Sequence, residues 1–150
     1  MKKKSERLEP VKALRERQLK DEARKLAQAS QALQAVSRQL TELEQYLQGY
    51  YADPARGNVT FKSAQDLIAY QQFIVKLNDA IARQRQMVAL KEAAFRAQQQ
   101  RWIEASANVD TIERLIARAR IEEQKKEDKR EQKVADELST RLFLSNSQDT

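Results

Sequence analysis

The sequence contains no cysteine and no histidine, and it has only two glycines and two prolines among 150 residues. The absence of cysteine and histidine removes the usual zinc ligands, the thiol nucleophile and the commonest general base. No apolar run approaches the roughly 20 residues that a helix needs to span a bilayer. We therefore expect no metal, no cofactor and no insertion into a membrane.

The start of the chain has one feature of a signal peptide. Lys2 to Lys4 resemble its basic segment, but residues 5–10, Ser-Glu-Arg-Leu-Glu-Pro, follow in place of an apolar stretch. We expect the chain to stay in the cytoplasm.

Charged residues make up 33% of the chain, and the formal net charge is +6. Residues 1–25 carry ten basic and five acidic side chains, an excess that could meet an acidic partner or no partner at all. A nucleic-acid binder needs a one-sided basic face, ideally with stacking aromatics. Because the signs are mixed along the chain, as on a solvated helix, we expect no nucleic-acid partner.

The first half of the chain shows a heptad repeat that predicts a coiled-coil helix. Position a is held by leucines, and they are Leu19, Leu26, Leu33, Leu40 and Leu47. Position d follows three residues later, at Glu22, Ala29, Val36, Leu43 and Tyr50. We place this helix at about residues 6–49, with Pro10 in its first turn and with Leu8, Val11 and Leu14 in a less regular apolar patch.

Residues 50–62 form the break between two predicted helices. Gly49 ends the first pattern, and Asp53-Pro54 and Gly57-Asn58 are turn sequences. Ser63, followed by Asp66 three residues later, resembles a capping box. We place the second helix at about residues 64–143.

The second predicted helix has a longer seam. Its position a is apolar over eight heptads, at Leu67, Ile74, Ile81, Val88, Phe95, Trp102, Val109 and Ile116. Its position d is apolar at both ends and polar in the middle, at Tyr70, Leu77, Gln84, Lys91, Gln98, Ala105, Ile112 and Ala119. Strict sevens over this length predict a left-handed supercoil.

Folded at residues 50–62, the chain is predicted to be all-α, a two-stranded antiparallel coiled-coil hairpin in a single domain of residues 1–150. The pairs expected across the seam are Leu47 with Leu67, Leu40 with Ile74, Leu33 with Ile81, Leu26 with Val88, and Leu19 with Phe95. In this register the polar d residues Gln84, Lys91 and Gln98 face mostly the leucine series.

Apolar side chains beyond positions a and d gather near the predicted turn, at Tyr46, Phe73, Ala80 and Met87. They either complete the core at that end or form an exposed strip for a partner. Trp102 leaves a similar choice between packing in the seam and anchoring a partner.

The C-terminal part of the second helix is built differently. Residues 122–133 are almost wholly charged and have no seam, although their helix propensity is high. Val134, Leu138 and Leu142 then restart an apolar stripe.

No catalytic constellation is present in the sequence. There is no glycine-rich phosphate loop, and the carboxylate pairs lie beside basic residues on predicted helix surfaces. We expect a protein that is not an enzyme.

Several short motifs resemble the FliJ family of the bacterial flagellar type III export apparatus. Tyr70-Gln71-Gln72-Phe73-Ile74 is similar to the start of the family's second helix, and residues 131–138 resemble its Gln-Lys-x-x-Asp-Glu pattern. Gln39-Leu40, Tyr46, Tyr50, Ala80-Ile81 and Trp102 also fit in order and spacing.

This resemblance implies a non-catalytic stalk, similar to the γ subunit of rotary ATPases. The joined ends of the hairpin would enter the hexameric ring of the export ATPase FliI and promote its assembly. The region near the turn would contact the export gate protein FlhA, and the protein would escort export chaperones. It would lie in the cytoplasm, peripherally at the inner membrane.

The resemblance also implies two sets of binding residues. The candidate gate strip consists of Gln39, Leu43, Tyr46, Tyr50, Phe73, Leu77, Ala80 and Gln84. The candidate ring residues are Gln132, Lys133, Asp136 and Glu137. The alternative is a generic coiled-coil scaffold or tether without an ATPase partner.

Overall fold

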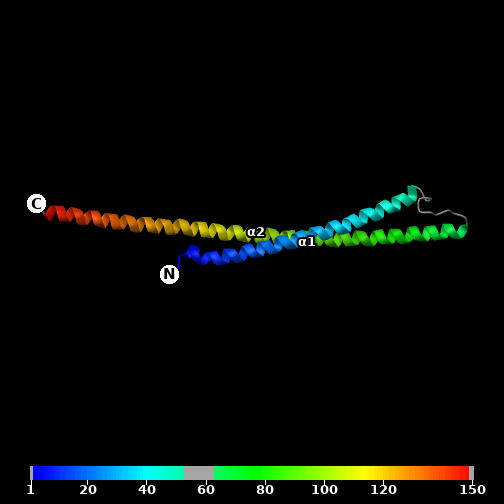
Figure 1. Cartoon of the computed structure of the whole chain (residues 1–150), viewed down its shortest axis with the longest axis horizontal. Helices are drawn as coiled ribbons and strands as arrows, with labels where there is room; N and C mark the ends of the chain where they lie inside the picture. The colour runs from blue at the N-terminus through cyan, green and yellow to red at the C-terminus, as the bar shows by residue number, and fades with distance from the viewer. Residues whose placement is uncertain (1, 53–62, 149–150) are drawn as a thin grey trace. The chain divides into compact units, whose positions relative to one another are not determined.

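The structure, a computed structural model, describes residues 2–52 and 63–148. It contains two long helices, α1 at Lys4–Ala52 and α2 at Ala64–Gln148 (Figure 1). The predicted fold class, all-α with two long helices, is confirmed. Most of the predicted loop at residues 50–62 lies outside the described residues.

The helix α1 begins earlier than predicted, so Pro10 lies inside it and not in its first turn. Proline has no N–H group, which removes one main-chain hydrogen bond from this part of α1. Two contacts with α2 hold the start of α1 in place. Ser5 is hydrogen-bonded to Glu123, and Glu9 forms an ion pair with Arg120. Tertiary contacts thus extend the helix past a residue that usually marks its start.

The helix α1 also ends later than predicted, at Ala52, with Gly49 inside it. The physical reason lies in Tyr50, whose ring and carbonyl are in contact with α2. At the start of α2 the Asp66 N–H donates to the Ser63 hydroxyl oxygen, 3.3 Å away, as a helix cap does. The last residue of α2 is Gln148, five residues beyond the predicted end.

The chain divides into two compact units, which are described separately. Unit 1 comprises Met1–Leu19 and Glu104–Thr150. In it the helices are antiparallel, because Ser5 contacts Glu123 while the later residue Glu9 contacts the earlier residue Arg120. Its buried apolar side chains occupy heptad positions a and d of α2, and they are Ala105, Val109, Ile112, Ile116 and Ala119.

The α1 part of unit 1 keeps the heptad phase of the leucine series. Leu8, Lys12 and Arg15 lie at seam positions and are half-buried, whereas Val11 and Leu14 are exposed. Of the predicted less regular patch of Leu8, Val11 and Leu14, Leu8 therefore lies in the seam, whereas Val11 and Leu14 lie on the surface. Lysine and arginine can pack their aliphatic stems along a seam while their charged ends stay in water, so the repeat continues without apolar residues.

Unit 2 comprises Lys20–Ile103, and its helices are also antiparallel. Three hydrogen-bonded pairs show this: Tyr70 bonds to Tyr50, Gln84 to Val36, and Gln98 to Glu22. Among the described residues of this unit, Leu77 and Ile81 are the buried apolar ones, and most other seam residues are half-buried. The exceptions are Gln98, which is buried, and Lys91, Leu67 and Trp102, which are exposed, Leu67 at 45% and Trp102 at 37%.

The register of unit 2 differs from the predicted one. Pairing Leu40 with Ile74 would place Val36 opposite residue 78, but Val36 is bonded by Gln84, so α2 is displaced by about six residues, close to one heptad. Gln84 and Gln98 contact Val36 and Glu22 of the d series of α1, because position d of one helix lies opposite position d of the other, and the prediction that they face mostly its leucines is wrong. Displacement by a heptad preserves the a and d faces, so periodicity could not distinguish the two registers.

Candidate protein-binding surfaces

Four aromatic side chains form a cluster in unit 2, and we call Tyr46, Tyr50, Tyr70 and Phe73 the aromatic cluster. The Tyr50 ring is central: its centroid lies 4.9 Å from that of Tyr46, 5.0 Å from Phe73 and 6.2 Å from Tyr70. The Tyr46 ring meets it edge-on, at an interplanar angle of 73°. Such tilted arrangements are favourable because ring edges are positive and ring faces negative.

Hydroxyl groups fix the geometry of the aromatic cluster. The Tyr70 hydroxyl donates to the Tyr50 main-chain carbonyl across the two helices, at 3.0 Å. The Tyr46 and Tyr50 hydroxyls are hydrogen-bonded to each other, also at 3.0 Å. The hydrogen bond with Tyr46, with a smaller contribution from burial, raises the pKa of the Tyr50 hydroxyl above its ordinary value of 10.0.

The candidate gate strip combines core and surface residues. Leu77 is 8% exposed and belongs to the core of unit 2. Tyr46 and Phe73, by contrast, are 54% and 38% exposed. Half-buried residues complete the strip at Leu43, Tyr50, Ala80 and Gln84. The strip therefore contains a core residue, Leu77, together with the exposed aromatic residues Tyr46 and Phe73.

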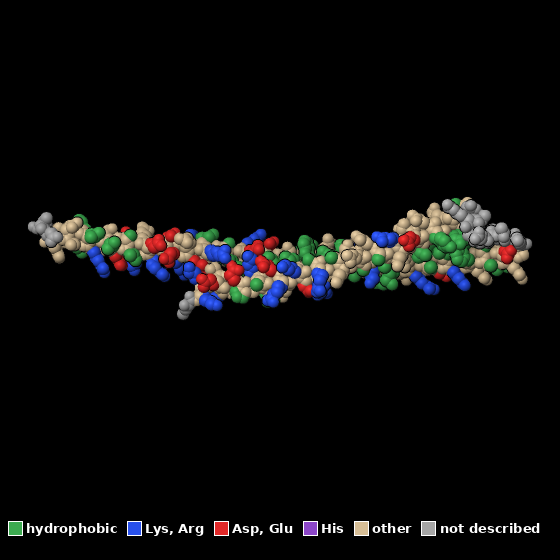
Figure 2. All heavy atoms as spheres, viewed as in Figure 1, with side chains coloured by type: hydrophobic (Ala, Val, Ile, Leu, Met, Phe, Trp, Pro, Cys, Tyr) green, Lys and Arg blue, Asp and Glu red, His purple; other side chains and the backbone are tan. Residues whose placement is uncertain are grey.

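The polar end of the strip is held by Gln84. Its Nε2 atom donates to the Val36 carbonyl at 2.9 Å and to the Gln39 Oε1 at 3.0 Å. These bonds bring Gln39 of α1 and Gln84 of α2 together, as the aromatic contacts bring Tyr50 and Phe73 together. In Figure 2, hydrophobic side chains gather over the last turns of α1 and the first turns of α2.

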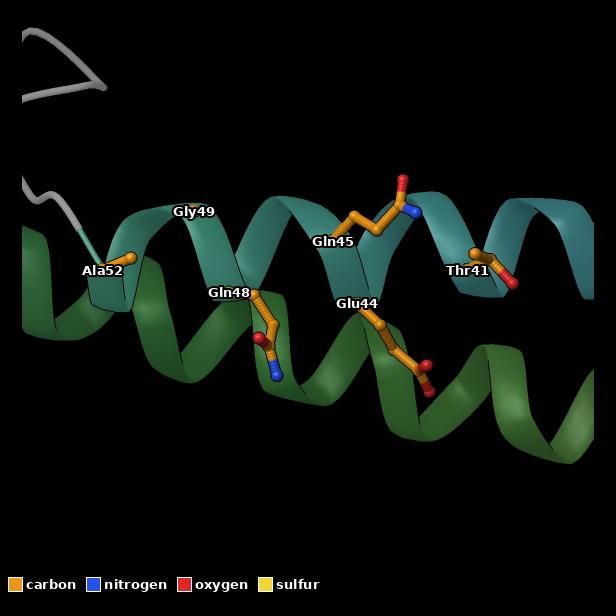
Figure 3. Close-up of a pocket in the computed structure, with 6 residues that line it drawn as sticks. All are labelled: Thr41, Glu44, Gln45, Gln48, Gly49 and Ala52. Atoms are coloured by element: carbon orange, nitrogen blue, oxygen red, sulfur yellow. The ribbon is translucent and has the colours of Figure 1, made fainter.

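The surface of unit 2 also has polar hollows. One, of about 480 Å³, is lined by residues of α1 alone: Thr41, Glu44, Gln45, Gln48, Gly49 and Ala52 (Figure 3). A second, of about 240 Å³, shares Glu44 and Gln48 and reaches α2 at Asn78, Ile81 and Arg85. The carboxylate of Glu44 lies 3.3 Å from Arg85 Nη2, so it is already paired with a cation.

The candidate ring residues lie in unit 1, on the part of α2 that is exposed throughout. Every described residue from Gln124 to Gln148 is exposed, whereas Glu123 is half-buried. The stripe of Val134, Leu138 and Leu142 is exposed as well. This segment therefore offers charged and apolar side chains that are not buried against the described part of the chain.

Glu123 marks the place where burial of α2 stops. Its carboxylate accepts hydrogen bonds from the Ser5 N–H at 3.0 Å and from the Ser5 hydroxyl at 2.8 Å. These two bonds, with smaller contributions from Lys3 and Arg120, lower the pKa of Glu123 below its ordinary value. Ser5 itself is buried. A serine at a helix start is a cap signal in sequence, but its distant partner on α2 was not predicted.

The described residues offer little for other kinds of site. Asp21 lies 2.6 Å from Arg24 Nη2 and 3.3 Å from Lys25 Nζ, and hydrogen bonds from these cations lower its carboxyl pKa, as expected for a surface ion pair. Within residues 2–52 and 63–148, no three acidic side chains are grouped so that they could hold a metal ion. Neither described helix has a segment with the length and hydropathy of a membrane span.

A model of the flagellar FliJ protein family matches residues 3–148 of the chain. The chain belongs to the FliJ family. No curated protein and no solved structure matches it. The match confirms the resemblance drawn from residues 70–74 and 131–138, and it makes the chain a member of a non-catalytic family of the flagellar export apparatus.

Proposed function

We propose that this FliJ family member is a stalk and adaptor of flagellar protein export, which promotes assembly of the FliI hexamer and couples that ring to the gate protein FlhA. It would also escort export chaperones, and it would work peripherally at the cytoplasmic face of the inner membrane. The observation that carries the proposal is the family match together with the assembly of the candidate gate strip from both helices.

The composition of the strip supports a protein contact. Interfaces are enriched in tyrosine and phenylalanine, and the residues that contribute most to binding are often aromatic. Tyr46 and Phe73 keep much of their surface in contact with solvent, while the Tyr50 ring packs against both of them. A partner that covers Tyr46 and Phe73 would therefore meet side chains that are already ordered, which reduces the entropy cost of binding.

The exposed segment of α2 supports a second, separate contact. Gln132, Lys133, Asp136 and Glu137 are exposed, and the stripe of Val134, Leu138 and Leu142 is close to them in sequence. An exposed apolar stripe among charges is typical of a helix that docks on another protein. We assign this segment to the ATPase ring.

The proposal is tested with purified FliI and FlhA from the same cell. Adding the chain should raise FliI turnover and hexamer formation, and replacing the four candidate ring residues with alanine should remove this effect. Unchanged turnover on adding the intact chain would contradict the stalk role. It would favour the generic scaffold or tether, which an extended parallel dimer in light scattering would support.

Gate binding is tested on the strip alone. Tyr46→Ala and Phe73→Ala should each weaken FlhA binding by roughly tenfold or more, as expected for aromatic residues at the centre of an interface. Val75→Ala is the matched control, because Val75 lies two residues from Phe73 and is 59% exposed but is not part of the strip. Equal losses in all three variants would argue against the strip as the contact.

A further inference from the structure

The seam of unit 2 allows two alignments of its helices. Sliding one helix of an antiparallel pair by seven residues brings each a position opposite an a position again, so the same faces remain buried. One alignment is the observed register, in which Gln84 bonds to Val36 and Tyr70 to Tyr50. The other, which we call the displaced register, is the pairing that begins with Leu47 opposite Leu67.

The displaced register would keep an apolar seam. Moving each α2 residue by one heptad places Val36 opposite Leu77 instead of Gln84, and Leu43 opposite Tyr70 instead of Leu77. It would also cover Leu67, which is 45% exposed in the observed register. Burial of this leucine is favourable because apolar surface leaves water.

The displaced register would also pair two charges of opposite sign. Glu22 would face Lys91, one heptad before its present partner Gln98. In the observed register Lys91 is exposed and makes no ion pair among the described residues. Lys91, unlike Gln84 and Gln98, therefore does not hold α2 in the observed register.

The observed register is held chiefly by polar and aromatic contacts that the displaced one would lose. They are the bonds of Gln84 to Val36 and Gln39, the bond of Tyr70 to Tyr50, the contact of Gln98 with Glu22, and the ion pair of Glu44 with Arg85. Because α1 and α2 are continuous helices, the displacement would also break the contacts of Ser5 with Glu123 and of Glu9 with Arg120. Each register thus satisfies groups that the other leaves unsatisfied.

We propose that unit 2 exchanges between these two registers, one heptad apart, and that the aromatic cluster exists only in the observed one. Seven residues correspond to about 10 Å of helix, a distance that separates Tyr50 from Tyr70 and Phe73. A partner that binds the aromatic cluster therefore stabilises the observed register, because it binds one of the two states better. This regulatory part rests on the proposed gate contact, whereas the existence of two registers does not.

The registers can be trapped separately, because the chain has no cysteine of its own. Val36→Cys with Gln84→Cys reports the observed register, and Val36→Cys with Leu77→Cys reports the displaced one. Val36→Cys with Lys91→Cys is the matched control, since Lys91 lies one heptad from Gln84 in the opposite direction. A disulfide forms only when the Cα atoms approach within about 7 Å, so each pair reads one alignment.

Under mild oxidation at low protein concentration, the 36–84 pair should form a disulfide first, and the 36–77 pair at least about tenfold faster than the 36–91 control. A rate for 36–77 no higher than the control would overturn the two-register proposal. Because Leu77 is a core residue, Glu22→Cys with Lys91→Cys gives a second reading of the displaced register without removing a buried leucine. It should also form a disulfide faster than the control.

The regulatory part is tested with the trapped forms. The chain locked in the observed register by a disulfide between Glu22→Cys and Gln98→Cys, both outside the candidate gate strip, should bind FlhA. The chain locked by 22–91 should bind it at least about tenfold more weakly. Equal binding of the two forms would overturn control by register. If neither form nor the untrapped chain binds FlhA, the gate contact itself is refuted, while the comparison of disulfide rates still decides the existence of two registers.

Discussion

Tyr50 takes part in the aromatic cluster through its ring, its hydroxyl group and its main-chain carbonyl. Two of these contacts cross between helices, and they keep the last turn of α1 helical past Gly49. In sequence Tyr50 is the last member of the d series, and its neighbour Gly49 indicates a helix end. The contacts of Tyr50 with α2 therefore keep α1 helical at a point where Gly49 by itself predicts the end of the helix.

The hydroxyl pair of Tyr46 and Tyr50 gives a prediction at the scale of one residue. Because the hydrogen bond with Tyr46 raises the pKa of Tyr50, Tyr46→Phe should lower that pKa toward its ordinary value. Absorbance titration of the phenolate band above pH 9 measures it, with Tyr51→Phe as the control. An unchanged Tyr50 titration in Tyr46→Phe would show that the hydroxyl pair does not form in solution.

The contact of Ser5 with Glu123 gives a second prediction at this scale. Since the folded-state pKa of Glu123 is lowered, the carboxylate stabilises unit 1 above the ordinary glutamate range of about pH 4, and this stability is lost as the pH falls through the lowered pKa. Glu123→Gln should therefore lower the melting temperature at pH 7 but not near pH 2. Glu122→Gln, an exposed neighbour, is the control. A pH-independent difference would contradict the role of the carboxylate charge.

At the scale of the helix, the seam separates residues that support the fold from residues that a partner could cover. Heptad spacing predicted the buried positions of α2 in unit 1, from Ala105 to Ala119, and these are buried. In unit 2 the same spacing predicted Leu67 and Trp102 at position a, and these side chains remain exposed to a considerable extent. Periodicity identifies which face of a helix is apolar, whereas burial also requires a partner opposite that face.

Leu77 and Val75 give a prediction for α2 as an element. Leu77→Ala should lower the free energy of unfolding by roughly 2–4 kcal/mol, because it removes a buried side chain and leaves a cavity. Val75→Ala should change it by less than about 0.5 kcal/mol, because Val75 is exposed. Chemical denaturation measures both. A loss in Leu77→Ala as small as that in Val75→Ala would assign Leu77 to a binding surface and not to the core.

At the scale of the whole molecule, contacts among the described residues are distributed unevenly along α2. Its residues up to Glu123 alternate between seam and surface, and those from Gln124 to Gln148 are exposed. A segment without buried contacts adds little to cooperative stability, since helix propensity alone barely sustains an isolated helix of this length in water. Such a segment is available for a partner.

Removing residues 124–150 tests this division of roles. The melting temperature of the remaining chain should stay within about 2 °C of that of the intact chain, because exposed residues contribute little to stability. The truncated chain should at the same time lose its effect on FliI turnover. Circular dichroism and an ATPase assay measure the two properties. A large fall in melting temperature would show that the segment packs against the rest of the chain.

The sequence by itself determined the fold class, the two helices and the family, because heptad repeats, turn residues and short motifs are local. Spacing also identified Tyr46, Phe73, Ala80 and Met87 as apolar residues beyond the seam positions, and the resemblance to the family implied the residues of the candidate gate strip. Only the tertiary structure decided the register of unit 2, the burial of Leu77 within that strip, the contact of Ser5 with Glu123 and the continuation of α1 to Ala52. The physical reason is that a seven-residue repeat is unchanged by a seven-residue displacement. The alignment of the two helices therefore depends on single contacts between residues far apart in the chain, such as Gln84 with Val36 and Tyr70 with Tyr50.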